Sequence, residues 1–147
     1  MKVLIDADAC PVVDIAVGLC REFGMECLLL CDTAHEMHRD GAETLVFDKG
    51  ADSVDFALVN RVAAGDMVIT QDYGLASMCL ARNCRVLHQD GWEYNLDNID
   101  ALLLVRHESR KHRAAGGRFK GQKKRTDSQD HAFEAALRGI LQTNVQG

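Results

Sequence analysis

The stretch VLIDADACPVVDIAVGLCREFGMECLLLC, residues 3–31, has the pattern of a strand, a helix and a second strand. Residues 3–6 and 27–31 are short apolar runs, as is usual in strands that are covered on both faces. Between them, Pro11 suits the first turn of a helix over residues 11–23, and Gly24 suits its C-terminal stop. The three elements together predict a βαβ unit with parallel strands.

The same alternation of strand and helix patterns continues along the chain. Residues 32–41 are polar and are predicted to form a loop. Further strands are predicted over residues 44–47, 66–70 and 85–88, and helices over residues 53–64, 75–82, 97–113 and about 128–141. The pattern predicts a single α/β domain over residues 1–147 with a mainly parallel five-stranded sheet of order 3-2-1-4-5.

The composition is typical of a globular protein, with 47% hydrophobic and 27% charged residues and one proline among 147 residues. No apolar run approaches the roughly 20 residues of a membrane span, and Asp6 comes too early for a secretory signal, so we expect a cytoplasmic protein without a membrane partner. Four of the six cysteines lie in apolar patterns, which favours reduced core thiols over disulfides or a zinc site: Cys20, Cys27, Cys31 and Cys79.

The net charge of −5 conceals a basic segment, residues 106–125. This segment holds nine of the 17 Lys and Arg residues and one acidic residue, a net charge of +8, which leaves −13 for the rest of the chain. Basic clusters of this kind are typical of proteins that bind nucleic acid or another polyanion, although a solvated loop is the alternative.

Acidic residues gather where the predicted strands end. They are Asp6 and Asp8 after the first strand, Asp52 and Asp55 in the helix after the third, and Asp72 after the fourth. Because ligands of parallel sheets bind at the carboxyl ends of the strands, we expect these side chains to converge. Clustered carboxylates repel unless a cation lies between them, and Mg²⁺ or Mn²⁺ prefers such oxygen ligands. The pattern predicts a divalent-metal site, with helix capping as the alternative for Asp52 and Asp72.

Other polar residues near these strand ends are less informative. Thr70 is expected to direct its hydroxyl toward the acids, where it could bond a carboxylate or a substrate phosphate. His35, His38 and His88 are interpreted as surface residues, because none is paired with a serine or cysteine as in a nucleophilic triad.

Four motifs of the chain resemble those of one known family. They are VLIDADACP at residues 3–11, GADSVD at 50–55, GDMVITQD at 65–72 and DHAF at 130–133. With these motifs the chain resembles the YaiI/YqxD family of uncharacterised bacterial proteins over nearly its whole length. That family looks like a branch of the PIN-like nuclease fold, so the resemblance implies a three-layer PIN-like domain and metal-dependent hydrolysis of RNA.

The resemblance also implies roles for individual acids. Asp6, Asp55 and Asp72 would be the catalytic, metal-binding acids, with Asp8 and Asp52 as supporting ligands of Mg²⁺ or Mn²⁺. Asp90 lies near the position of a fourth acid, although its Asp-Gly sequence is also a common turn pair.

Three functions remain open from the sequence. The first is a metal-dependent ribonuclease whose basic segment grips RNA through Arg110, Arg113, Arg118, Lys120, Lys123 and Lys124. The second is a phosphatase similar to haloacid dehalogenases, because Asp6 and Asp8 are spaced like their nucleophile and acid. The third is a non-catalytic module that binds RNA or a ribosomal surface through the basic segment.

Overall fold

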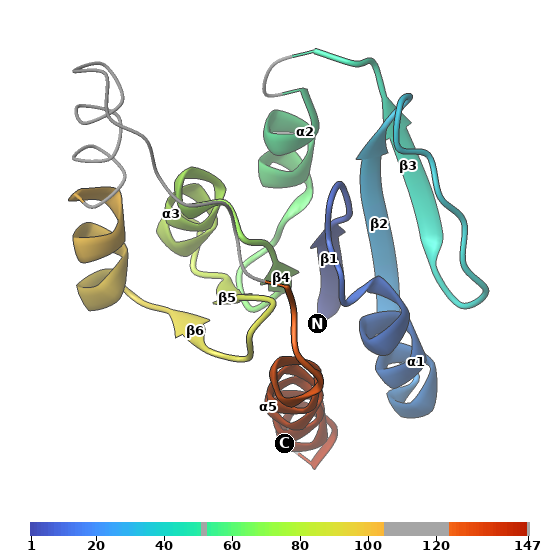
Figure 1. Cartoon of the computed structure of the whole chain (residues 1–147), viewed down its shortest axis with the longest axis vertical. Helices are drawn as coiled ribbons and strands as arrows, with labels where there is room; N and C mark the ends of the chain where they lie inside the picture. Colours follow the sequence, from blue (N-terminus) through green and yellow to red (C-terminus); the bar gives the residue numbers. More distant parts are fainter. Residues whose placement is uncertain (51–52, 105–123, 147) are drawn as a thin grey trace.

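Six strands form one sheet in the order β3-β2-β1-β4-β5-β6 (Figure 1). The computed structural model describes residues 1–50, 53–104 and 124–146. The strands are β1 (Lys2–Asp6), β2 (Glu26–Asp32), β3 (Glu43–Phe47), β4 (Met67–Ile69), β5 (Arg85–Leu87) and β6 (Glu93–Tyr94). The helices with defined bounds are α1 (Val13–Phe23), α2 (Ser53–Arg61), α3 (Tyr73–Ala81) and α5 (Asp127–Gln146), and residues 96–104 are also helical.

The predicted α/β class and the order of the first five strands are confirmed. All pairs among β1 to β5 are parallel, and β1 lies between β2 and β4. The chain builds outward from β1 to β3 and then returns to the other side of β1 to add β4 and β5. The strand order therefore reverses between β1 and β4, where open α/β sheets commonly bind ligands.

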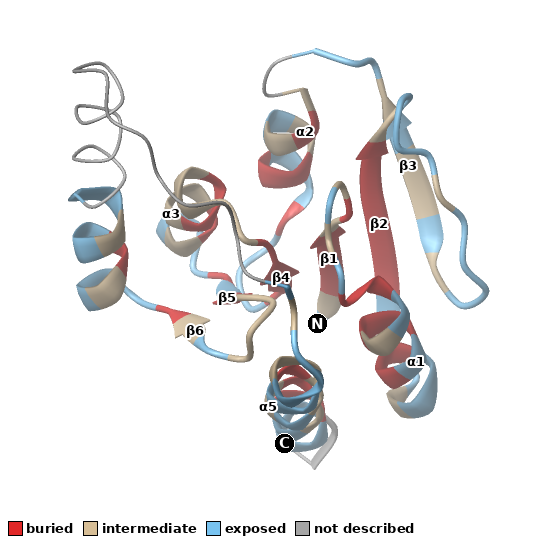
Figure 2. Ribbon diagram, in the orientation of Figure 1, coloured by how far each residue is buried: buried red, intermediate tan, exposed pale blue. Residues whose placement is uncertain are grey.

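Two helical layers cover the sheet, and each encloses its own part of the core (Figure 2). Because side chains alternate along a strand, Val3 and Ile5 pack with α1 and α5 on one face, while Leu4 packs with α2 and α3 on the other. All three side chains are fully buried. The apolar run that predicted a doubly covered strand is explained by these two layers.

Several predicted boundaries are wrong by a few residues. Helix α1 begins at Val13 instead of Pro11, because a turn in which the Cys10 N–H donates to the Ala7 carbonyl separates it from β1. Helix α2 ends at Arg61, three residues early, where a turn closed by the side chain of Asp66 follows. At the other end of α1, Gly24 takes the left-handed conformation (φ 66°) and ends the helix as predicted.

Two strand assignments also need correction. Strand β2 extends through Asp32, which pairs with Phe47 of β3, so this acid ends a strand and does not begin a loop. Strand β6 is a sixth strand that the sequence pattern did not predict, and it runs antiparallel to β5. A two-residue strand is too short to show a periodic pattern.

Two further predictions concern the remaining chain. Helix α5 is longer than the predicted range of 128–141, and the predicted helix over 97–113 lies outside the described residues beyond 104. In the described part of the chain, no helix is long and apolar enough to cross a membrane. The described cysteines are all unpaired thiols, and Cys20, Cys27, Cys31, Cys79 and Cys84 are buried.

Candidate functional site

The end of β1 lies at the point where the strand order reverses. Asp6 is its last residue, with Leu30 of β2 on one side and the end of β4 on the other. Asp8 follows in the turn after β1, and Asp32 is the last residue of β2. The parallel arrangement therefore brings carboxylates from two strands and a turn to one edge of the sheet.

A cavity of about 260 Å³ opens at this edge. We call it the acidic cavity, because five of the described residues that line it are aspartates: Asp6, Asp8, Asp32, Asp55 and Asp72. Asp55 lies in the first turn of α2, and Asp72 is the residue that directly precedes α3. Four of these five were predicted from the sequence, whereas Asp32 was not.

Thr70 connects two of the acids. Its hydroxyl donates a hydrogen bond to Asp6 Oδ2 (2.8 Å) and accepts one from the backbone N–H of Asp72 (3.0 Å). Asp72 also caps helix α3, because its Oδ1 accepts hydrogen bonds from the N–H groups of Gly74 and Leu75 (2.8 and 3.2 Å). Capping and cavity lining are thus combined in Asp72, and the cap holds the carboxylate in a defined orientation.

The electrostatic environment of Asp6 is unfavourable for its charge. The pKa of Asp6 is raised to about 7, mainly by burial, while the hydrogen bond from Thr70 acts in the opposite direction. The charges of Asp55, Asp72 and Asp8 contribute smaller parts of this rise, in that order. These three acids therefore lie close enough to Asp6 to repel it, and a cation in the cavity would relieve that repulsion.

Asp8 and Asp32, which line the cavity, form a second group of possible ligands together with the neighbouring His35. The His35 Nδ1 lies 2.9 Å from Asp32 Oδ1 and 3.7 Å from Asp8 Oδ1, and the three donor atoms lie within 4.8 Å of one another. Burial, with the charge of Asp32, raises the pKa of Asp8. The hydrogen bond from His35 lowers the pKa of Asp32.

The sequence contains a signal that could identify Asp32. Like Asp6, it directly follows a continuous apolar strand run, and the two strands are neighbours in the sheet. His35 was interpreted as a surface residue, and its side chain is indeed 56% exposed. Its position beside two carboxylates depends on the turn after β2, where the Ala34 N–H donates to Asp32 Oδ1 (2.9 Å).

Asp90 is not among the described residues that line the acidic cavity. It forms an ion pair with Arg125 (2.7 Å) and lines a neighbouring cavity with His88. Arg125 was counted in the basic segment, but it is held by Asp90 and Asp130. Asp90 is therefore better described as an anchor for Arg125 than as a fourth acid of the cluster.

The remaining predicted residues are placed only in part. Lys124 is exposed, just before the anchored Arg125. The other predicted ligands of metal or nucleic acid lie outside the described residues: Asp52, Arg110, Arg113, Arg118, Lys120 and Lys123.

Comparison with known proteins supports the resemblance seen in the motifs. A family model described as "Uncharacterized BCR, YaiI/YqxD family" matches residues 4–143. A UPF0178 protein of Exiguobacterium sibiricum is 51% identical over 141 residues, covering 96% of each chain. A UPF0178 protein of Clostridium acetobutylicum is 44% identical over 143 residues, covering 96% of this chain and 97% of the relative. The chain therefore belongs to the YaiI/YqxD family.

Proposed function

We propose that the protein is a divalent-metal-dependent ribonuclease that hydrolyses RNA phosphodiesters at the acidic cavity. The observation that carries this proposal is the convergence of Asp6, Asp55 and Asp72, from three separate parts of the chain, on one cavity where the strand order reverses. The PIN-like resemblance assigns catalysis to the same three acids.

The donor chemistry of the cavity fits Mg²⁺ or Mn²⁺. Carboxylate oxygens are the ligands that these hard cations prefer, and Asp8 Oδ1 is buried without a hydrogen-bond partner among the described residues. Asp6, Asp8, Asp55 and Asp72 would hold the ion. When bound there, the ion supplies a polarised water and charge neutralisation for phosphodiester hydrolysis.

The protein's own residues have separate tasks in this proposal. Thr70 fixes one oxygen of Asp6, and the cap on α3 fixes Asp72, so neither carboxylate needs to reorient when an ion binds. The basic segment, including the exposed Lys124, would bind the phosphates that flank the cleaved bond.

Substitution of single acids tests this assignment. Asp6→Asn and Asp72→Asn keep the shape of the side chain, and Asn also serves as a helix cap, but each removes charge that the ion needs. We expect hydrolysis of RNA in Mn²⁺ to fall about 10²-fold or more in either variant. Binding of Mn²⁺, followed by calorimetry, should weaken in parallel.

Asp40→Asn is the matched control, because Asp40 is an exposed aspartate of the polar loop and does not line the acidic cavity. It should leave both measurements unchanged. If the unaltered protein binds RNA but never cleaves structured or single-stranded substrates with Mn²⁺, the ribonuclease assignment must give way to a non-catalytic binding module.

A further inference from the structure

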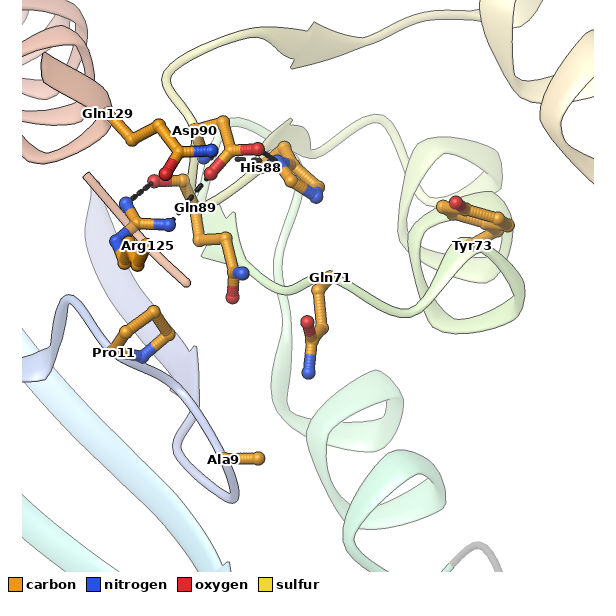
Figure 3. A pocket seen from close by; sticks show the side chains of 9 residues that line it. All are labelled: Ala9, Pro11, Gln71, Tyr73, His88, Gln89, Asp90, Arg125 and Gln129. Carbon is orange, nitrogen blue, oxygen red and sulfur yellow. Dashed lines mark hydrogen bonds and ion pairs between the residues drawn. The ribbon is translucent and has the colours of Figure 1, made fainter. Parts of the chain in front are cut away.

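A second cavity, of about 560 Å³, is larger than the acidic cavity, and Figure 3 shows the side chains that line it. Gln71 lines both cavities, and Ala9, which borders the larger one, directly follows Asp8 in the turn after β1. The two cavities therefore share a boundary.

The wall of this larger cavity contains a cation that is already neutralised. The Arg125 guanidinium donates to Asp90 Oδ1 (2.7 Å), to Asp130 Oδ1 (2.6 Å) and to the carbonyl of Gln89 (2.5 Å). Two carboxylates thus compensate one positive charge. The cavity is poorly suited to a second phosphate, and its polar groups favour a neutral ligand.

Those polar groups are mainly amides. Gln71 follows β4 and Gln89 follows β5, and Figure 3 shows both side chains directed into the cavity, while Gln129 of α5 also lines it. An amide offers hydrogen-bond donors and an acceptor on one planar group, which matches the alternating donors and acceptors on the edge of a nucleobase.

Aromatic rings complete the lining. Tyr73 and His88 border the cavity, and the His88 ring stacks on Trp92 with centroids 4.3 Å apart and an interplanar angle of 13°. The backbone N–H of Asp90 donates to His88 Nδ1 (3.0 Å), so the neutral ring carries its proton on Nε2. These contacts hold the ring in place, and flat side chains of this kind stack on nucleobases irrespective of their sequence.

We propose that this larger cavity, here called the glutamine pocket, binds the nucleobase of the nucleotide next to the scissile phosphate. This inference has two parts: a base binds in the pocket, and its neighbouring phosphate lies at the acidic cavity. The second part rests on the proposed ribonuclease function. The pocket selects single-stranded substrate, because a base must leave its stack to enter a cavity.

Trp92 provides an intrinsic reporter for the test, since it is the only tryptophan of the chain and stacks on a residue of the pocket. Its fluorescence is followed during titration with each of the four nucleoside 5′-monophosphates and with ribose 5-phosphate, all in the presence of a chelator. We expect saturable binding of at least one nucleotide that is about tenfold tighter than binding of ribose 5-phosphate.

The variant Gln71→Leu/Gln89→Leu removes the two amides and keeps the side-chain volume. It should weaken nucleotide binding about tenfold and ribose 5-phosphate binding by much less, because of the two residues only Gln71 also lines the acidic cavity. Gln142→Leu, at an exposed position of α5, is the matched control and should bind as the unaltered protein does. Three results would each overturn the proposed pocket. They are equal affinity for sugar phosphate and nucleotide, no saturable binding of any nucleotide, and unchanged nucleotide affinity in the double variant.

Metal-free binding separates this inference from the ribonuclease proposal. Base-dependent binding without any RNA cleavage in Mn²⁺ would retain the pocket and reject the nuclease. Cleavage by a protein that shows no base-dependent binding would retain the nuclease and reject the pocket.

Discussion

Asp6 combines burial with the proximity of other carboxylates, and its titration should therefore affect stability. Its pKa in the folded protein, about 7, lies above the ordinary value of 3.8. The folded state consequently holds this proton more tightly than the unfolded state does, and the free energy of unfolding should fall as pH rises from about 4 to 7. The direction is opposite to that of a carboxylate held in an ion pair.

The variant Asp6→Asn removes this effect. Without metal, it should raise the free energy of unfolding at pH 8 by about 1 to 3 kcal/mol, because one pKa unit corresponds to about 1.4 kcal/mol. Below pH 4 the gain should disappear, since Asp6 is then protonated in both states. Urea unfolding at several pH values in a chelator measures both quantities, and a variant that is less stable at pH 8 would contradict the prediction.

Asp66 is the matched control, because its pKa is lowered in the folded protein whereas that of Asp6 is raised. It lies at the other end of the sheet, where burial acts against its charge but hydrogen bonds from Lys2 (2.6 Å) and the Ala63 N–H (2.8 Å) lower its pKa overall. Its contribution to stability is present above the unfolded pKa and is lost as pH falls through the lower folded value. Asp66→Asn should therefore destabilise the protein at neutral pH.

The hairpin between β5 and β6 lies close to helix α5, and this close approach predicts how a substitution in the hairpin changes stability. Gly91 has a φ of +93°, and a Cβ atom there would lie 2.6 Å from the carbonyl oxygen of Ala132. Gly91→Ala should destabilise the protein by about 3 kcal/mol or more, because backbone strain and a clash with the helix backbone add together. Thermal or urea unfolding measures the loss.

Gly65 separates these two causes. Its φ is +89°, almost the same, but nothing lies within 4 Å of the position of a Cβ atom. Gly65→Ala should cost only the strain, about 1 to 2 kcal/mol. Similar losses in the two variants would show that α5 moves aside easily and that the hairpin does not fix its position.

Positive and negative charges are concentrated in different parts of the whole molecule. Under the proposed function, we expect the basic segment to provide affinity for RNA and the acidic cavity to carry out hydrolysis. The basic segment carries +8 and the rest of the chain −13. Replacing Lys120, Lys123 and Lys124 together by Ala should weaken RNA binding and lower the slope of log affinity against log salt by about 2, at about 0.7 for each phosphate contact on a single strand.

The control for this experiment replaces basic residues elsewhere. Arg21 and Arg82 are exposed residues outside the basic segment, so Arg21→Ala/Arg82→Ala should leave the salt slope unchanged. Asp6→Asn should retain or tighten RNA binding, because it removes negative charge near the phosphate, although it lowers cleavage about 10²-fold or more. An unchanged slope in the triple lysine variant would place the RNA-binding surface elsewhere.

The sequence by itself determined the parallel sheet and most of the acidic cavity. Apolar runs and helical spacing reported the elements, and Asp6 and Asp72 stand at strand ends that any sheet of this order brings together. Asp32 ends β2 in the same way, one residue beyond the apolar run that predicts this strand.

Only the tertiary structure decided the placement of His35, Asp90 and the glutamine pocket. Arg125 and Asp90 are 35 residues apart, and neither belongs to a periodic pattern, so their pairing depends on how α5 packs beside the β5–β6 hairpin. The physical reason is that hydrophobic periodicity encodes which face of an element is buried, whereas polar contacts between loops depend on turn geometry and on distances set by the completed core.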